Sequence, residues 1–552
     1  MKDSTTGKTT VPPCREDCPA GIDVPRYIRC IQNGDFSGSL AVIREKIPFP
    51  AVCGYACVRP CEIRCARIQV DEAMAIRMLK QAASEYGTYV TPAPEATSPS
   101  GHRVAVIGSG PAGLAAAYYL VRIGHKVEVF DKDQRAGGMM RYAIPEYRLP
   151  EQALDDDLRF IWQSGVVFNG GRSIRLADIL GKYDAILIAT GNQLSKRLAI
   201  EGSELSGVLW GLDFLRSVKA NEKVSLNERV CVIGGGNVAV DAALSAGRLE
   251  AKEVRIICLE ERDAMPAYPW EIAQALEEGI TIEDGWGPKV IHGKNGSVTG
   301  IECVRCTSVF DDNHMFNPSY DLSVTRYFDA DTVIFAIGQT PDIDFIDARG
   351  LKTHGDLIKV DTDLMTGIRG VFAAGEAATG PSSIIDAIAQ GRQAAASIDR
   401  YLGGTGSIDR PEEEYPCLEV HEPAPRGTCR HKGAVTDPAE RLAGFDPVEP
   451  GYDRETAVRE ALRCLACDVR QFTVLVDPLL CKECGYCKEV CTLNVFASSD
   501  AFNPSGYKPV IVKDSDRCVG CLKCLYICPD FAVSIRNGGK KPDDEFRPQS
   551  AN

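Results

Sequence analysis

The order of apolar and polar positions along the chain separates it into regions with different secondary structure. Between residues 102 and about 403, short apolar runs that read as strands alternate with helical patterns, which is typical of an α/β fold. Residues 14–86 instead carry helical patterns, notably VPRYIRCIQNGDFSGSLAVI and AMAIRMLKQAASEY, among seven cysteines. A small cysteine-dense module follows at about 471–535.

Two irregular stretches mark boundaries between these regions. TPAPEATSPSG (91–101) is rich in Pro, Ser and Ala and reads as a linker. Residues 404–455 are irregular and Pro-rich, and RETAVREALRCLACD then predicts a short helix over 454–468. The last residues of the chain form a polar tail.

Charge and cysteine content narrow the classes of function. The net charge of −14 argues against binding to nucleic acid or to an anionic membrane surface. No apolar stretch reaches about 18 residues and the start lacks an apolar signal region, so we expect a cytoplasmic protein without membrane insertion. Without a signal peptide, the 23 cysteines in tight clusters indicate metal binding rather than disulfides.

The first dinucleotide fingerprint is RVAVIGSGPAGLAAAYYLVRIGHKVEVFDK (103–132), which reads as strand, glycine turn, helix, strand and acid. Gly108 permits the tight turn, and Gly110 lets the backbone approach a pyrophosphate at the helix N-terminus. Gly113 allows close packing of helix and strand. Asp131 ends the second strand, where an acid can accept hydrogen bonds from ribose hydroxyls.

A second fingerprint, RVCVIGGGNVAVDAALSA, occupies residues 229–246. Gly234, Gly236 and Ala239 take the GxGxxA positions, and Glu260 follows the end of the next strand. Two fingerprints in one chain indicate two dinucleotides, one prosthetic and one that exchanges.

Two CxxCxxCxxxC runs, CKECGYCKEVCT (481–492) and CVGCLKCLYICP (518–529), have the pattern of a two-cluster bacterial ferredoxin. In that pattern the fourth cysteine of each run serves the other cluster. Zinc is the alternative, but zinc sites rarely use eight thiolates at this repeated spacing. We therefore assign Cys481, Cys484, Cys487 and Cys528 to one [4Fe–4S] cluster, and Cys518, Cys521, Cys524 and Cys491 to the other.

Several further motifs resemble the small (β) subunit of bacterial glutamate synthase, a module that also occurs in dihydropyrimidine dehydrogenase and in ferredoxin-dependent transhydrogenases. The motifs are GGMMRYAIPEYRLP, ILIATGN, DAMPA, VIFAIGQTPD and GVFAAGEAATGPSSIIDAIAQGRQAA, and the resemblance covers about 14–400. It implies FAD at the first fingerprint and NAD(P)H at the second, which is inserted between the two halves of the FAD domain.

The resemblance also implies which residues bind the two nucleotides. Gly375-Glu376 stands where the family usually has Gly-Asp, and Asp131 where it usually has glutamate; both changes are small. For FAD the residues are Gly108, Gly110, Pro111, Ala112, Gly113, Asp131, Lys132, Gly138, Arg141, Ala189, Thr190, Gly191, Gly375, Glu376, Ser383 and Ile384. For NAD(P) they are Gly234, Gly235, Gly236, Asn237, Val238, Ala239, Glu260, Arg262 and Gly338.

A redox disulfide next to the flavin is not expected. GGMMRYAIP, after the first fingerprint, contains no cysteine. Cys303 and Cys306 form a CxxC, but they lie in an alternating strand pattern, where residues three apart point to opposite faces. The electrons of the flavin must therefore pass to another acceptor.

The family usually begins with a CxxC pair that is missing from the start of this chain, where CREDCP (14–19) and CGYACVRPCEIRC (53–65) remain. RCLACD (463–468) resembles that opening pair. Our hypothesis is that one cluster is bound by Cys464 and Cys467 together with Cys14 and Cys65. The alternative is a vestigial pair in a surface helix.

The second N-terminal cluster would use Cys18, Cys57 and Cys61. In the family its fourth ligand can be Gln or Glu, but this chain has Lys80 and Gln81 in that region, and a protonated lysine has no lone pair to donate. Gln81 or Cys53 must serve, or the cluster has three protein ligands. The remaining cysteines in and around these segments, Cys30, Cys417 and Cys429, look ordinary.

The predicted fold class is α/β, with two Rossmann-like domains for FAD and NAD(P), a preceding helical iron–sulfur domain and a small α+β ferredoxin-like domain at the end. The expected domains are 1–100 (helical iron–sulfur), 101–204 and 331–404 (FAD), 205–330 (NAD(P)), 405–470 (connector with the CxxC pair), 471–537 (ferredoxin) and 538–552 (polar tail).

The expected function is an NAD(P)H-dependent oxidoreductase that moves electrons between a nicotinamide nucleotide, FAD and four [4Fe–4S] clusters, to or from a ferredoxin or partner subunits. The cofactors carry the chemistry, so no acid or base residue is expected to be indispensable. One alternative is the glutamate synthase β subunit itself, although that subunit ordinarily lacks a fused ferredoxin. Another is an electron-conducting scaffold whose nucleotide site is silent.

The coenzyme preference depends on CLEER (258–262), where NADPH-using relatives typically have YRR. Glu260 can accept hydrogen bonds from both ribose hydroxyls of NADH and would repel a 2′-phosphate. The alternative is that Glu260 turns outward and Arg262 binds the phosphate. We expect NADH to be preferred.

Overall fold

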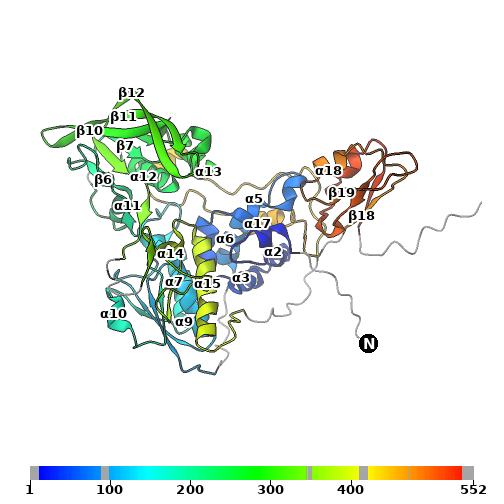
Figure 1. Cartoon of the computed structure of the whole chain (residues 1–552), viewed down its shortest axis with the longest axis horizontal. Helices are drawn as coiled ribbons and strands as arrows, with labels where there is room; N and C mark the ends of the chain where they lie inside the picture. Colours follow the sequence, from blue (N-terminus) through cyan, green and yellow to red (C-terminus); the bar gives the residue numbers. More distant parts are fainter. Residues whose placement is uncertain are drawn as a thin grey trace, which may run out of the picture.

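The computed structural model describes residues 11–88, 98–224, 226–343, 345, 351–409, 420–469 and 472–537. The polar tail, Cys417 and most of the 91–101 linker lie outside the described residues. The N-terminal helices lie centrally, with the two α/β units on one side and the ferredoxin-like module on the other (Figure 1). Within the described part of the chain, no helix has both the length and the apolar character needed to cross a membrane.

The N-terminal domain consists of short helices that pack around buried cysteines. Asp23 and Asp35 cap the two longer helices that follow them, by accepting from the backbone N–H of Arg26 and Gly38. The elements are α1 (Pro13–Glu16), α2 (Val24–Gln32), α3 (Phe36–Arg44), α4 (Pro50–Ala56), α5 (Pro60–Ile63), η1 (Ala66–Gln69) and α6 (Ile76–Tyr86).

The first α/β unit has a parallel five-stranded sheet in the order β17-β4-β1-β2-β3. Its central strands β1 and β4 are nearly continuous apolar runs, as expected for strands covered on both faces. Helix α15 packs closely on α7, and a Cβ on Gly391 would lie 2.2 Å from the carbonyl oxygen of Ala112. The elements are β1 (Arg103–Ile107), α7 (Pro111–Arg122), β2 (Lys126–Phe130), α8 (Met139–Tyr142), α9 (Glu151–Gln163), β3 (Val167–Asn169), α10 (Leu176–Ile179), β4 (Ala185–Ile188), β17 (Val371–Ala373), α14 (Glu376–Thr379) and α15 (Ile384–Tyr401).

The second α/β unit is inserted between β4 and β17 of the first, and its parallel sheet has the order β6-β13-β7-β8-β9. An antiparallel sheet, β10-β11-β12, extends from it. The elements are β6 (Val208–Trp210), α11 (Gly211–Lys219), β7 (Arg229–Ile233), α12 (Asn237–Arg248), β8 (Glu253–Cys258), η2 (Arg262–Ala264), α13 (Pro269–Glu277), β9 (Thr281–Asp284), β10 (Trp286–Lys294), β11 (Ser297–Phe310), β12 (Phe316–Asp329) and β13 (Thr332–Phe335). Short strand pairs link or flank the two units: β5 (Leu194–Ser195) with β14 (Gln339–Thr340), and β15 (Thr353–His354) with β16 (Leu357–Ile358).

The CxxC of β11 does not follow a simple alternation. Cys303 and Cys306 are both buried, and the pairing with β12 shifts register between Val304 and Arg305. Their neighbours differ, since Cys303 lies near Cys231 and Arg326 whereas Cys306 lies near Glu260 and Glu261. Both cysteines are free, and the Cys306 thiol donates to the carbonyl of Ser308.

The connector ends in α17, which is shorter than the sequence pattern predicts. Helix α17 spans Arg454–Ala461, and Cys464 and Cys467 lie in the turns that follow it, where Ala466 has φ 50°. The prediction that the helix continues through the cysteine pair is wrong. The other elements of this part are α16 (Pro438–Arg441), β18 (Phe472–Val476), α18 (Tyr486–Val490), β19 (Phe496–Ser498), β20 (Val510–Val512), η3 (Ser515–Arg517), α19 (Lys523–Ile527) and β21 (Val533–Asn537).

Candidate functional site

A cavity of about 440 Å³ lies between the two glycine turns. The structure brings together around it most of the residues expected to bind nucleotides. From the first set these are Gly108, Gly110, Pro111, Ala112, Asp131, Gly138, Ala189, Thr190, Gly191, Gly375, Glu376, Ser383 and Ile384, and from the second set Gly236, Asn237, Val238 and Gly338.

The glycine turns leave room for a ligand against the backbone. Gly108 and Gly234 have φ of 106° and 137°, which disfavour other residues. A Cβ on Gly110 or Gly236 would meet no atom within 4 Å, so both positions are open toward the cavity. Two helices begin directly after these turns, which is the geometry that binds a pyrophosphate. The residues present therefore fit two dinucleotides.

Two of the acidic side chains around the cavity already have hydrogen-bond partners within the protein. Asp131 Oδ2 accepts from the backbone N–H of Ser109 at 2.7 Å and from its hydroxyl at 2.5 Å. Glu376 accepts from Ser382 N–H at 2.9 Å, and burial raises the pKa of its carboxyl. Thr190 Oγ1, by contrast, is buried without a hydrogen-bond partner among the described residues, which is a feature of a wall that faces a ligand.

Three residues expected at the flavin site lie outside the cavity wall. Gly113 allows helix–strand packing, since a Cβ there would lie 2.1 Å from the carbonyl oxygen of Gly108. Lys132 Nζ pairs with Asp342 at 2.8 Å. Arg141 is buried, where it donates to the carbonyl of Ala136 at 2.7 Å and pairs with Glu151 and Asp155. Lys132 and Arg141 therefore bind other protein groups, and the Arg141 contacts join α8 to α9.

The remaining residues of the second fingerprint surround its turn. Ala239 is fully buried beneath the turn, and the Glu260 carboxylate lies beside Gly235. Arg262 is directed elsewhere, because its Nη2 donates to the carbonyl of Ile282 at 3.2 Å.

Twelve cysteines line three small cavities in groups of four. All three cavities are very small, with volumes of about 20 Å³ or less, so they are alike in size as well as in donor number. The groups are Cys14, Cys65, Cys464 and Cys467; Cys481, Cys484, Cys487 and Cys528; and Cys491, Cys518, Cys521 and Cys524. Four thiols around one cavity form the donor set of a [4Fe–4S] cluster.

The first of these groups joins residues that lie about 400 positions apart in the sequence. Cys464 is buried and Cys467 is half-buried, so the pair does not sit on a surface helix. Burial raises the pKa of the Cys464 thiol to about 12. A bound metal would deprotonate these thiols in spite of this, since the thiolate is the ligand.

A fourth group of thiols lies between α4 and α6. Cys18, Cys53, Cys57 and Cys61 are all buried. Burial lowers the pKa of the Lys80 ammonium, but these thiols outweigh that effect, so its pKa is raised overall. The Gln81 Nε2 donates to Glu85 Oε1 at 2.9 Å and to the carbonyl of Glu449, while Gln81 Oε1 is buried without a hydrogen-bond partner among the described residues.

No three or more His, Cys, Asp or Glu side chains of the described residues close around a point suited to a lone metal ion. The thiols are instead spaced around cavities. Cys30 is buried in the N-terminal core and Cys429 is exposed, so neither joins a four-thiol group.

Contacts between the units connect the cavities in space. Ala56 and Val58, which flank Cys57, line the nucleotide cavity. On the ferredoxin side, Lys523 Nζ donates to Gln69 Oε1 at 3.3 Å, and Gly520 accepts from Arg426 at 3.1 Å. These contact residues were not predicted from the sequence. The only indication there was that Ala56 and Val58 adjoin Cys57, a predicted cluster ligand.

Residues 102–391 match the pyridine nucleotide-disulphide oxidoreductase family, over more than half of the chain. The chain belongs to this family. Residues 7–90 match dihydropyrimidine dehydrogenase domain II, 4Fe-4S cluster, and residues 480–532 match the 4Fe-4S dicluster domain. The oxidoreductase thus carries iron–sulfur domains at both ends of its nucleotide-binding unit, which confirms the predicted fold class.

Among curated relatives, this oxidoreductase is 37% identical to the NADP(+)-dependent formate dehydrogenase subunit beta of Moorella thermoacetica, over 82% of this chain and 70% of that protein. It is 34% identical to the NADPH-Fe(3+) oxidoreductase subunit beta of Geobacter sulfurreducens, over 82% and 75%. It is 30% identical to the glutamate synthase [NADPH] small chain of Mycobacterium tuberculosis, over 73% and 88%. The resemblance to the glutamate synthase small subunit is confirmed.

Proposed function

We propose that this oxidoreductase is the subunit of a larger complex that takes electrons from NAD(P)H and distributes them through iron–sulfur clusters. The observation that carries the proposal is the adjacency of a two-dinucleotide cavity to the Cys57 group, through Ala56 and Val58. The three relatives are named as a subunit or a small chain, which supports a role within an assembly.

The chain's residues would hold two nucleotides in one cavity. The turn at Gly108–Gly113 and the segment at Gly375–Ile384 would bind FAD, and the turn at Gly234–Ala239 would bind the nicotinamide nucleotide. When bound, FAD would supply the conversion of a hydride pair into single electrons. The protein's part is to orient both nucleotides and to line the cavity with apolar groups such as Met140 and Leu212 that exclude water.

Four [4Fe–4S] clusters would account for the four groups of thiols. Three groups have complete four-cysteine donor sets around cavities of similar size. For the fourth group we propose Cys53 as the fourth ligand beside Cys18, Cys57 and Cys61. Cys53 is fully buried among these thiols and supplies the same donor type as the other three groups, whereas Gln81 could offer only its buried Oε1.

The contacts suggest an order for these centres. The Cys57 group adjoins the nucleotide cavity, and Cys61 and Cys65 on either end of α5 link it to the group completed by Cys464. The Lys523–Gln69 contact then brings the Cys518 group toward the Cys65 group. Cys484, in the last group, is exposed, so that cluster would exchange electrons with a partner at the surface. Either direction of flow is compatible with this order.

The coenzyme is a finer part of the proposal. The relatives are named for NADP(+) or NADPH, but this chain has Glu260 beside the second turn. We propose that Glu260 shifts the preference toward NADH.

Anaerobic reduction of the isolated chain by NADH or NADPH tests the central claim. We expect bleaching of flavin absorbance, followed by EPR signals from reduced clusters, and activity with an artificial dye. A chain that binds the nucleotide but neither bleaches nor reduces the dye would instead be a conducting scaffold with a silent site. Native mass measurement on protein from its own host tests the assembly, and only homo-oligomers would contradict it.

A further inference from the structure

We propose that Arg67 and Arg463 form a two-way clasp that positions the Cys464–Cys467 turn against the segment carrying Cys65. The inference rests on the proposed ligand set Cys14, Cys65, Cys464 and Cys467. Arg463 directly precedes Cys464, and Arg67 follows Cys65 by two residues. Each arginine belongs to one side of the shared site and binds the backbone of the other side.

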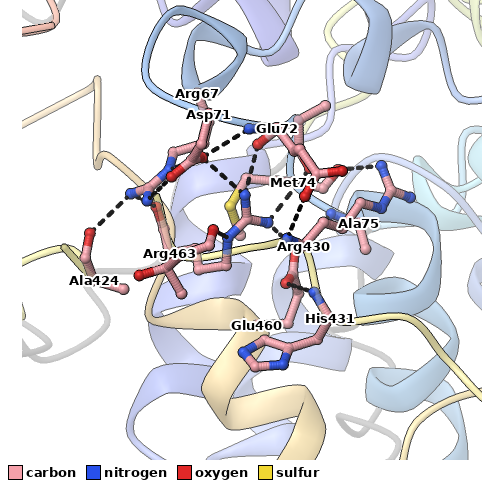
Figure 2. Close-up of polar contacts among 12 residues, drawn as sticks. Arg67, Asp71, Glu72, Met74, Ala75, Ala424, Arg430, His431, Glu460 and Arg463 are labelled. Carbon is pink, nitrogen blue, oxygen red and sulfur yellow. Dashed lines mark hydrogen bonds and ion pairs between the residues drawn. The ribbon is translucent and has the colours of Figure 1, made fainter. Parts of the chain in front are cut away.

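The hydrogen bonds of the clasp are reciprocal (Figure 2). Arg67 Nη1 donates to the carbonyl of Arg463 at 2.8 Å. In return, Arg463 Nη2 donates to the carbonyl of Glu72 at 2.7 Å and to Asp71 Oδ1 at 3.0 Å. Asp71 also forms a two-pronged pair with Arg67, at 2.7 and 2.6 Å. One carboxylate therefore serves both arginines.

A second carboxylate joins the two sides from the connector. Glu460 Oε1 accepts from Arg463 Nη1 at 2.8 Å and from the backbone N–H of Ala75 at 2.9 Å. Its other oxygen accepts from the backbone N–H of His431 at 3.0 Å. Figure 2 shows these groups converging from the N-terminal domain and from two parts of the connector. The network thus fixes three stretches of chain, around residues 67–75, 424–431 and 460–463.

Burial makes the clasp rigid and dependent on arginine. The side chains of Arg463 and Glu460 are 0% exposed, and that of Arg67 is 1% exposed. Two arginines face two carboxylates, so the charges balance, and removal of one member leaves a buried charge without its partner. Lysine cannot replace the planar fork that reaches the acceptors on both sides.

The clasp also affects the position of a cluster ligand and the reduction potential of the cluster. The carbonyl that Arg67 holds belongs to the residue before Cys464, so a change in this contact displaces the Cys464 thiol. Loss of either arginine leaves a buried carboxylate, Asp71 or Glu460, without its full pairing near the cluster, and negative charge lowers the reduction potential of a cluster. Arg67 and Arg463 are therefore positioning residues for this cluster and keep its potential high enough to relay electrons toward the ferredoxin module.

The test uses the full-length holoprotein with Arg463→Gln, Arg463→Lys and Arg67→Gln. Arg441→Gln is the matched control, because Arg441 is another buried arginine of the connector but binds Glu277 of the second α/β unit. Cys464→Ser identifies the EPR signal of the shared cluster. Bound FAD, measured for each variant, reports whether the α/β units remain folded.

We expect Arg463→Gln to lose that signal, with about four of about 16 irons per chain, or to keep it at a lower midpoint potential. NAD(P)H should still reduce the flavin, while electron delivery to the ferredoxin clusters falls at least about tenfold. Chemical reductants should still reduce those clusters. Arg463→Lys, which keeps the charge, should retain the potential better than Arg463→Gln while still loosening the site.

The outcomes separate the clasp from the ligand set. If Cys464→Ser removes the signal and Arg463→Gln and Arg67→Gln behave like Arg441→Gln, the ligand set stands and the clasp is overturned. If Cys464→Ser leaves every signal intact, the ligand set is wrong and the clasp falls with it. If Arg463→Gln loses its FAD, that variant is misfolded and its cluster signal is not informative. The EPR signal and potential of Arg463→Lys and Arg67→Gln then test the clasp by the same criteria.

Discussion

The Glu260 carboxylate lies against Gly235, so close that a Cβ on the glycine would come within 2.7 Å of Glu260 Oε2. Gly235 is in the turn that precedes α12, where the phosphates and ribose of a dinucleotide bind. Glu260 has therefore not turned outward from the site. Arg262 Nη2 donates to the carbonyl of Ile282 and its backbone N–H donates to Asp284, so one arm of its guanidinium is held by the neighbouring strand.

The first prediction concerns coenzyme choice. A carboxylate at this position accepts from both ribose hydroxyls of NADH and repels a 2′-phosphate by a few kcal/mol, or about tenfold or more in kcat/KM. We expect the wild type to prefer NADH, and Glu260→Arg to shift the ratio toward NADPH by at least about tenfold.

Steady-state kcat/KM with both nucleotides measures this preference. Glu261→Arg is the control, because Glu261 is exposed and pairs with Arg305 outside the turn. A wild type that prefers NADPH would refute the carboxylate argument. An unchanged ratio in Glu260→Arg would mean that Glu260 does not face the ribose.

The second prediction concerns the shared cluster. Cys14→Ser and Cys464→Ser should each remove the same EPR signal and leave the ferredoxin signals in place, because both thiols line one cavity. Cys484→Ser, at the exposed group, should affect a different signal. Truncation after about residue 455 should remove the ferredoxin module and also damage the N-terminal cluster. Loss of different signals from the first two variants would contradict the shared site.

The third prediction concerns pH and the N-terminus of α4. Asp157 of α9 is fully buried and accepts from the backbone N–H of Val52 at 3.0 Å, and burial raises the pKa of its carboxyl to about 7. The pKa of the Asp157 carboxyl is higher in the folded than in the unfolded protein. Its contribution to the free energy of unfolding is therefore fully present below about pH 4 and is lost as the pH rises through about 7.

Asp157→Asn keeps a neutral acceptor in this place. The wild type should lose stability as the pH rises and the variant should not. The free energy of unfolding of Asp157→Asn minus that of the wild type should therefore increase by roughly 2–3 kcal/mol from pH 5 to pH 8. Thermal release of the flavin, followed across this range, measures the difference. Asp156→Asn, at an exposed neighbour that pairs with Arg159, should show no such trend, and a flat difference for Asp157→Asn would contradict the raised pKa.

Local motifs explain why the α/β units and the thiol groups could be predicted. Glycine positions such as Gly108 and Gly234 require conformations that few other residues adopt, so their spacing specifies a turn without knowledge of the fold. Each CxxCxxCxxxC run contains four cysteines, which is the number of ligands that a [4Fe–4S] cluster needs, so the sequence alone predicts the ligand sets. The proximity of Cys464 to Cys65 followed only from a family resemblance, because no local pattern encodes a contact across about 400 residues.

The features that sequence reasoning missed are tertiary. Helix α17 ends at Ala461 because the following backbone turns so that Arg463 reaches Glu72 and the cysteine pair faces the cavity. The register shifts in β11 arise from its pairing with β12. The cap that Asp157 provides for α4 joins two domains. Each depends on a partner far away in the chain, which periodicity cannot reveal.

The fourth prediction concerns the cluster next to the nucleotide cavity. Lys80 is buried near the Cys18, Cys53, Cys57 and Cys61 group and, when protonated, has no lone pair for iron. Of the two remaining candidates, Cys53 lies among the thiols and offers the same donor type as the other three groups, while Gln81 offers only Oε1, a buried oxygen without a hydrogen-bond partner among the described residues. The fourth ligand should therefore be Cys53, and a thiolate at that position should make this an all-cysteine cluster.

Cys53→Ala should remove or convert one cluster signal, lower the iron content by up to about four per chain, and slow electron transfer out of the reduced flavin. Gln81→Leu, a matched change on the neighbouring helix, should leave the iron content and the spectrum unchanged. EPR of the dithionite-reduced protein, with iron and flavin quantified on the same samples, distinguishes the two variants. Retention of every signal in Cys53→Ala together with loss of one in Gln81→Leu would assign the ligand to the amide, and retention in both would mean that three cysteines suffice.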